Sequence, residues 1–133
     1  MIVADSNLIA SCVLESAATA AARQLRTDDG EWYVPTLWRA EVMNILSTMI
    51  RSRGLSAQTA DELFTSLCGA LRAYERDPAS EDVFDLVARF GITGYDAQFV
   101  ALAQELNCPL YTQDKELLQK FPTVARPFYT GRT

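Results

Sequence analysis

Short apolar runs alternate with helical patterns along this chain, and that alternation constrains the fold more than any other feature of the sequence. The runs "MIVA" at 1–4, "EWYV" at 31–34 and "PLYT" at 109–112 have the length and apolar character of buried strands. A fourth run, "VARPF" at 124–128, is a candidate edge strand, where proline is tolerated. Helical crossovers between strands imply a mainly parallel sheet with helices on both faces, so we expect an α/β fold.

Seven segments carry a helical pattern, at 7–14, 16–27, 35–54, 56–71, 81–90, 94–106 and 113–121. Thr36 and Ser80 are the expected N-caps of two of these helices, and Gly54 and Gly91 are their expected closing residues. Residues 71–76, "LRAYER", fit either the end of a helix or a polar third strand. Sheets of this kind bind ligands beyond the carboxyl ends of their strands.

Length and composition limit the class of protein. The chain has 133 residues, of which 49% are hydrophobic, and this predicts one globular domain over residues 1–133. Charged residues interrupt the longest apolar stretches, so no membrane span is predicted, and without a targeting signal we expect a cytoplasmic protein. The three cysteines form no C-x-x-C pair, which favours reduced thiols over a disulfide framework or a zinc site.

The sequence contains no histidine, and its net charge is −5. Without imidazole the chain cannot build a Ser-His-Asp triad, a His-paired cysteine nucleophile or an H-E-x-x-H zinc site. The acidic balance argues against a general nucleic-acid coat, so any contact with nucleic acid must be local. A hydrolase with this composition would rely on carboxylates, with or without a metal.

Asp5 and Asp114 occupy equivalent places in the predicted fold. Each lies at or just past the C-terminal end of an apolar run, where the next helix begins. Both side chains should therefore reach the ligand-binding edge of the sheet. Either one alone could be a simple N-cap, but the pair is harder to explain in that way.

Glu41 and Asp96 lie on apolar helix faces, where solvent-facing acids are not expected. Glu41 follows Trp38 by three residues and precedes Ile45 by four, so it projects beside the apolar stripe. Asp96 shares its face with Phe99. The alternatives are that Glu41 is an edge residue whose carboxylate reaches solvent and that Asp96 completes a capping box that begins at residue 93.

Carboxylates brought together without histidine repel one another unless they are protonated or bridged by a cation. Mg²⁺ prefers oxygen ligands and keeps several waters, so two to four carboxylates from different elements form a plausible open site. Such an ion polarises a phosphate and lowers the pKa of bound water. The pattern therefore indicates hydrolysis of phosphodiesters.

Three stretches, "MIVADSNLI", "PTLWRAEVMNIL" and "GITGYDAQFVALAQELNCPLYTQDKEL", resemble the PIN domain family, particularly its VapC-like toxins, and the resemblance covers nearly the whole chain. It implies a three-layer α/β/α sandwich with a central, mainly parallel sheet. It also implies an endoribonuclease that depends on Mg²⁺ or Mn²⁺ and is neutralised by a cognate antitoxin. The residues at the family's metal-binding and catalytic positions are Asp5, Glu41, Asp96 and Asp114.

The resemblance implies supporting roles for two further residues. Ser6 falls where the family commonly places a hydroxyl beside the metal, and Asn44 looks like its frequent supporting asparagine. The alternatives are that Ser6 only caps a helix and that Asn44 only borders the core. Arg39 and Lys115 adjoin the acids in sequence and are candidates for holding RNA.

Other sequence features leave several interpretations open. Tyr95 or Trp38 could stack on a base, although Trp38 also suits the core. A homodimer is expected from the family, and Leu63, Phe64 and Leu67 could belong either to its interface or to the core. The competing functions are a catalytically idle PIN-like interaction module and a phosphoacceptor receiver domain. A receiver domain would have neighbouring acids after the first strand, and Asp5 lacks such a neighbour.

Overall fold

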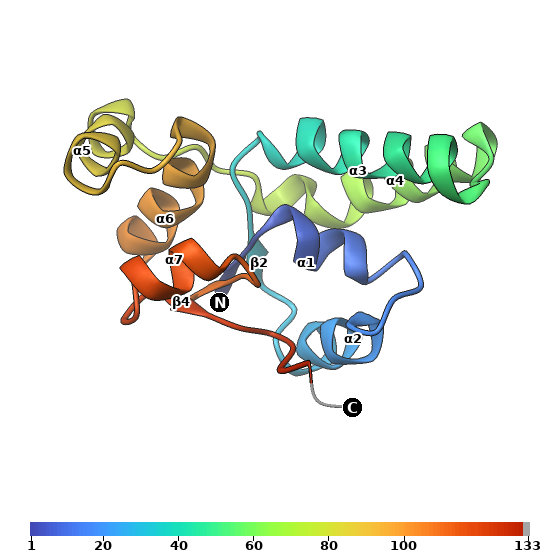
Figure 1. Ribbon diagram of the computed structural model, residues 1–133, viewed down its shortest axis with the longest axis horizontal. Coiled ribbons are helices and arrows are strands. Elements are labelled where there is room, and N and C mark those ends of the chain that lie inside the picture. The colour runs from blue at the N-terminus through green and yellow to red at the C-terminus, as the bar shows by residue number, and fades with distance from the viewer. Residues whose placement is uncertain (132–133) are drawn as a thin grey trace.

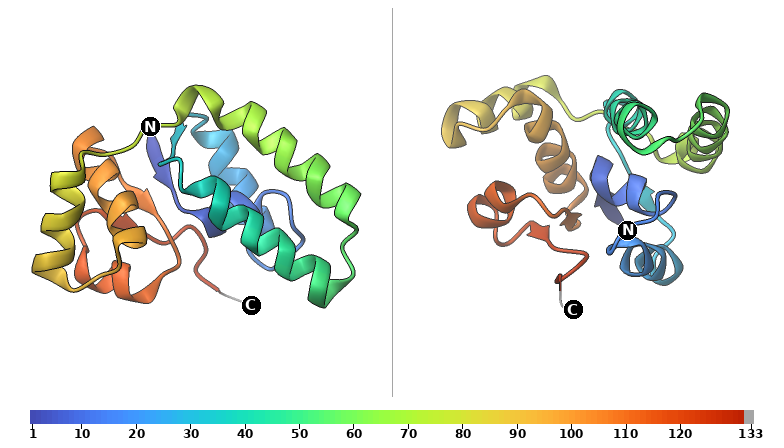
Figure 2. Two further views of the ribbon diagram at one scale, coloured as in Figure 1. Left: turned by 90° about the horizontal axis from the view of Figure 1, so that it is seen from above. Right: turned by 45° about the vertical axis from the view of Figure 1, so that its right-hand side comes forward.

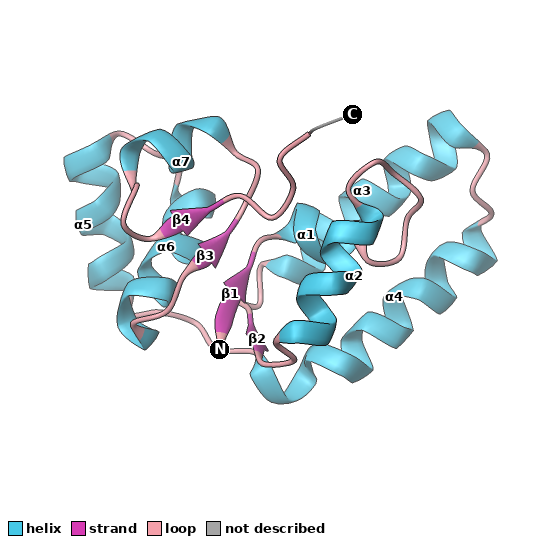
Figure 3. Cartoon of the chain, turned by 90° about the horizontal axis from the view of Figure 1, so that it is seen from below, coloured by secondary structure: helices cyan, strands magenta, loops and turns pink. Residues whose placement is uncertain are grey.

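The computed structural model, which describes residues 1–131, has a parallel sheet between two groups of helices (Figure 1). Its strands are β1 (Ile2–Ala4), β2 (Trp32–Tyr33), β3 (Leu110–Tyr111) and β4 (Ala125–Arg126). They are hydrogen-bonded in the order β2-β1-β3-β4, and every pairing is parallel. The predicted α/β fold with a central parallel sheet is confirmed, and Figure 3 shows the four strands side by side.

The side chains of β1 and β3 alternate between two hydrophobic cores, as a strand with both faces covered requires. In β1, Val3 faces one core, whereas Ile2 and Ala4 face the other. In β3, Leu110 belongs to the first core and Tyr111 packs against the second. The sheet therefore forms the middle layer of a three-layer sandwich.

Helices cover both faces of the sheet, and Figure 2 shows the two groups separated by it. The first core lies under α5 (Ser80–Phe90), α6 (Gly94–Leu106) and α7 (Lys115–Lys120). The second lies under the other four helices, which are α1 (Ser6–Ser11), α2 (Thr19–Asp28), α3 (Trp38–Arg53) and α4 (Ala57–Leu71). Leu67 is buried in the second core, and Leu63 and Phe64 pack against it.

Two predicted N-caps do not form. Helix α3 begins at Trp38 with no side-chain cap, and α5 begins after Ala79, also uncapped. The Thr36 backbone N–H and hydroxyl instead donate to the Asp77 carboxylate, at 2.8 Å and 2.9 Å. Hydrogen bonds to a carboxylate are stronger than those between neutral groups, and these bonds hold Thr36 against Asp77 instead of at the start of α3. The predicted closing glycines, 54 and 91, both adopt the left-handed conformation.

Residues 71–76 combine both of their expected structures. Helix α4 ends at Leu71 and continues as a 3₁₀ turn over Arg72–Tyr74. Glu75 then forms a single parallel bridge with Val34, beyond the end of β2. The segment is therefore no full strand, but it extends the sheet edge by one residue pair. Over residues 1–131, no helix combines the length and hydropathy that crossing a bilayer would require.

Candidate active site

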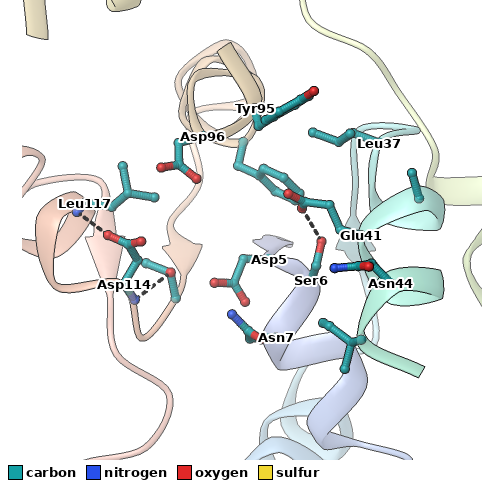
Figure 4. Close-up of a pocket in the computed structure, with 14 residues that line it drawn as sticks. Asp5, Ser6, Asn7, Leu37, Glu41, Asn44, Tyr95, Asp96, Asp114 and Leu117 are labelled. Carbon is teal, nitrogen blue, oxygen red and sulfur yellow. Dashed lines mark hydrogen bonds between the residues drawn. The ribbon is translucent and has the colours of Figure 1, made fainter. Parts of the chain in front are cut away.

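One pocket of about 510 Å³ opens where β1 and β3 end, and all four of the singled-out acids line it. Asp5 follows β1, Glu41 comes from α3, Asp96 from α6, and Asp114 precedes α7. The same pocket is lined by Ser6, Asn7, Leu37, Ala40, Asn44, Ile45, Tyr95, Phe99, Thr112 and Leu117. In Figure 4 the carboxylates of Asp5, Asp96 and Asp114 face one shared space, and Glu41 approaches it from the side of α3.

Asp5 and Asp114 are helix caps and pocket residues at the same time. Oδ1 of Asp5 accepts a hydrogen bond from the Leu8 backbone N–H at 2.8 Å, which caps α1. Oδ1 of Asp114 accepts from the Leu117 N–H at 3.0 Å, which caps α7. Because capping occupies one oxygen, each carboxylate can still offer its second oxygen to a ligand. The two interpretations of these acids are therefore compatible.

Glu41 is fixed by a neighbour from another helix. The Ser6 hydroxyl, at the start of α1, donates to Glu41 Oε1 at 2.6 Å. Asn44 lies one turn further along α3, on the same pocket wall (Figure 4). Ser6 therefore orients an acidic side chain in addition to its place in the helix.

Asp96 lies in the first turn of α6, where its backbone N–H donates to Thr93 Oγ1 at 3.1 Å. Thr93 is the N-cap predicted from the sequence, so this half of the expected capping box forms. The Asp96 side chain is partly exposed and lines the pocket. The cap of α6 thus fixes the backbone of Asp96 and leaves its carboxylate free to face the pocket.

The pocket raises the pKa of two of its acids. Asp5, with a relative exposure of 9%, has a pKa raised to about 6, first because burial removes water from its charge and then because Glu41 and Asp114 repel it. Hydrogen bonds from Thr112 and from the Leu8 backbone oppose the shift. Burial also raises the pKa of Asp96, with repulsion from Asp114 and Glu41 adding to it. Glu41 and Asp114 therefore act electrostatically on both Asp5 and Asp96.

Among residues 1–131, no lysine or arginine forms an ion pair with any of these four acids. Nor do three acids in this part of the chain meet closely enough to form a ready-made ligand cluster. The carboxylates surround the pocket rather than touching at its centre. Oxygen donors without a cationic partner are the ligands that suit a hard divalent ion, so the donor set fits Mg²⁺ or Mn²⁺ in its chemistry.

Two candidate RNA-binding residues are occupied elsewhere. The Arg39 guanidinium pairs with Glu75, with its Nε 2.6 Å and Nη2 2.7 Å from the carboxylate oxygens. Trp38 is fully buried, and its indole N–H donates to the same Glu75. Lys115 is exposed at the start of α7 but lies outside the pocket lining. Tyr95 does line the pocket and is 62% exposed.

Sequence reasoning missed two polar residues of the site. Thr112, fully buried, follows β3, and its Oγ1 accepts from the Asp114 backbone N–H at 3.0 Å. Its hydroxyl also opposes the rise in the pKa of Asp5, so it acts on two of the acids. The residue type alone does not indicate this role. The position of Thr112 at the end of a predicted strand, on the ligand-binding edge of the sheet, is the signal that could have indicated it. Asn7 lines the pocket beside Asp5 (Figure 4).

The chain belongs to the PIN domain family, whose model matches residues 3–124. It is 29% identical over 129 residues to Ribonuclease VapC3 from Pyrobaculum aerophilum, which covers 95% of this chain and 98% of that protein. The family predicted from the sequence is thus confirmed.

Solved structures share the fold. PAE2754 from Pyrobaculum aerophilum matches with a TM-score of 0.70 and 21% identity, over 93% of this chain and 81% of that one. FitAcB from Neisseria gonorrhoeae matches with a TM-score of 0.72 and 13% identity, over 98% of this chain and 99% of that one. FitAB bound to an IR36 DNA fragment matches with a TM-score of 0.71 and 15% identity, over 99% of both chains.

Proposed function

We propose that this protein is an endoribonuclease that depends on Mg²⁺ or Mn²⁺ and is the toxin of a toxin–antitoxin pair in the cytoplasm. The observation that carries the proposal is the pocket itself, which gathers Asp5, Glu41, Asp96 and Asp114 from four elements far apart in sequence. The relative named Ribonuclease VapC3, which matches nearly the whole chain, supports RNA as the substrate.

The four carboxylates would hold the ion, with Asp5 and Asp114 kept in place by their own helix caps. Ser6 would orient Glu41 through its hydroxyl, and Thr112 would help to position Asp114 through the backbone N–H of that residue. When bound, a divalent ion supplies Lewis-acid activation of water and neutralises charge on a phosphate. Leu37, Ile45 and Phe99 add apolar side chains to the lining of the site.

The uncompensated acids also suit a basic inhibitor. No described cation pairs with the four acids, so an antitoxin could bring its own. We propose that the antitoxin inserts an arginine-rich segment at the pocket, since guanidinium binds carboxylates bidentately. Crosslinking of the isolated complex should place the partner beside Asp5 and Asp96. A partner located wholly away from both residues would refute this mode of inhibition.

Cleavage of defined RNAs by the wild type and by Asp96→Asn, with Mg²⁺, with Mn²⁺ and with chelator, tests the proposed activity. We expect metal-dependent cleavage by the wild type only. An absence of cleavage by a folded wild type with either metal would instead favour the catalytically idle interaction module. Cleavage by Asp96→Asn at the wild-type rate would show that the pocket is not the active site.

A further inference from the structure

A second hollow, of about 520 Å³, adjoins the acidic pocket and differs from it in character. Its lining comes from α5, α6 and the loop before α5, and most of it is apolar; we call it the aromatic groove, with Pro78, Val83, Phe84, Thr93, Tyr95 and Gln98 among its lining residues. Tyr95 lines both the groove and the acidic pocket, so the two hollows adjoin at this side chain. Figure 4 shows Tyr95 at the rim of the acidic pocket, next to Asp96.

The exposed aromatic rings of the molecule concentrate here. Among the described residues, five large apolar side chains are exposed, and the two aromatic ones, Phe84 at 68% and Tyr95 at 62%, both line the groove. The other three exposed side chains are methionines 1 and 43 and isoleucine 50. Phe84 belongs to α5 and Tyr95 to α6, so the two rings in this groove are not simply neighbours on one apolar helix face.

The polar groups of the groove suit a neutral ligand better than a charged one. The carboxylate of Asp77 at its edge is already bound by Thr36. No described lysine or arginine lines the groove, so it offers no cationic side chain to a phosphate. Gln98 and Ser80 can exchange hydrogen bonds with the edge of a heterocycle. Planar aromatic surface with a few amide and hydroxyl groups is the chemistry that recognises an unpaired base.

We propose that the aromatic groove is a nucleobase subsite, in which Phe84 and Tyr95 stack on a base next to the phosphate that is cleaved. This inference rests on the proposed ribonuclease function, because the acidic pocket would hold that phosphate. Tyr95, shared by both hollows, sets the distance from the cut to the recognised base. The subsite favours single-stranded RNA, whose bases are free to leave the stack.

The test compares Phe84→Ala, which removes the ring, with Phe84→Trp, which keeps a stacking surface, and Phe84→Leu, which keeps only apolar bulk. Phe84 is the better target because Tyr95 adjoins Asp96. Cleavage of a short unstructured RNA gives kcat and KM. Binding of the same RNA is measured by fluorescence anisotropy in an Asp114→Asn background, which keeps the RNA intact. Ile50→Ala, an exposed site outside both hollows, is the matched control.

We expect Phe84→Ala and Phe84→Leu to weaken binding and raise KM about tenfold, with Phe84→Trp and Ile50→Ala near the wild type. An abasic nucleotide beside the cleaved bond should cost the wild type the same factor and cost Phe84→Ala nothing further. Metal-dependent cleavage with unchanged KM in Phe84→Ala would overturn the subsite and leave the ribonuclease standing.

RNA binding that requires Phe84, without any cleavage, would keep the subsite and remove the proposed activity. Failure of the folded wild type to bind or cleave RNA would overturn both. A change in sedimentation of Phe84→Ala, with RNA binding intact, would show that the groove contacts a protein chain instead.

Discussion

Glu75 and Asp5 are both shielded acids, but their surroundings are opposite. Glu75 accepts hydrogen bonds from Arg39 and from the Trp38 indole, and the Arg39 guanidinium is the main reason that its pKa is lowered. Asp5 has only neutral donors, and burial raises its pKa to about 6. Glu75, which links α3 to the end of the 3₁₀ turn, therefore has a cationic partner. Asp5, which faces the pocket, has none among the residues that the structure describes. An acid left in this way destabilises the protein until a ligand arrives.

The largest effect should be on catalysis. Asp5→Asn, Glu41→Gln, Asp96→Asn and Asp114→Asn each remove a proposed metal ligand with little change in volume, so RNA cleavage should fall by about two orders of magnitude or more. Glu75→Gln, outside the pocket, should retain cleavage within a few-fold of the wild type, as initial rates with Mn²⁺ and Mg²⁺ would show. Near-wild-type cleavage by two of the four pocket variants would contradict the proposal that these acids hold the metal.

Neutralising the pocket acid Asp5 should increase the stability of the metal-free protein, although it should abolish cleavage. Asp5→Asn removes a buried charge and keeps a side chain that can cap α1, so the free energy of unfolding in chelator at pH 7 should rise by about 1 to 3 kcal/mol. Denaturant unfolding measures this change. The same variant should lose most of the stabilisation that excess Mg²⁺ or Mn²⁺ gives the wild type. A lower stability in chelator with an undiminished metal effect would mean that Asp5 is structural.

Glu75→Gln should be destabilising, because it leaves Arg39 and the Trp38 indole without their charged acceptor. We expect the midpoint of thermal unfolding to fall by about 3 °C or more. Asp85→Asn, which breaks an exposed pair with Arg89 on α5, is the matched control and should change the midpoint little. Equal effects of the two variants would show that the Glu75 pairing is only another surface contact.

Asp5 and Glu75 should also make the stability of the protein depend on pH in opposite directions. The pKa of Asp5 is raised in the folded state, so its favourable contribution is full below its ordinary value of 3.8 and is lost as pH rises towards 6. The pKa of Glu75 is lowered, so its contribution is present above its ordinary value of 4.5 and is lost as the pH falls. Unfolding free energies in chelator from pH 4 to pH 7 should fall less steeply for Asp5→Asn than for the wild type. A parallel curve would contradict the raised pKa.

The smallest effect is expected at Asp28, an exposed acid at the end of α2 that accepts a hydrogen bond from Gln24. Asp28→Asn should change neither cleavage nor the unfolding midpoint measurably. It therefore serves as the reference for what removing one negative charge does by itself. A clear loss of cleavage in this variant would indicate that the overall charge of the protein, and not the pocket acids alone, controls cleavage.

Patterns of local origin were predictable from the sequence. The parallel sheet follows from apolar runs that alternate with helices, and the positions of Asp5 and Asp114 follow from the strands they terminate. Glu41 and Asp96 were recognisable because they interrupt apolar helix faces. All four side chains line one pocket, while their role as metal ligands stays a prediction.

Contacts between distant segments were not predictable in the same way. Arg39 adjoins the pocket acids in sequence, yet it turns to Glu75, which lies 36 residues further along the chain. Thr36 has the sequence context of a cap, yet it binds Asp77 across a gap of 41 residues. Helix α1 was expected to run to residue 14 but ends at Ser11, and α2 starts only at Thr19. No periodic pattern encodes which long-range acceptor a side chain will choose.

The capping hydrogen bonds of Asp5 and Asp114 have an evolutionary consequence. Asparagine caps a helix about as well as aspartate, so neither cap requires a carboxylate, and at Asp5 selection for metal-free stability alone would favour asparagine. Only selection for chemistry preserves the negative charge. In lineages that no longer need the activity, asparagine should accumulate at both positions while the strands before them stay apolar. The ratio of aspartate to asparagine at the two caps would then record whether a descendant is still an enzyme.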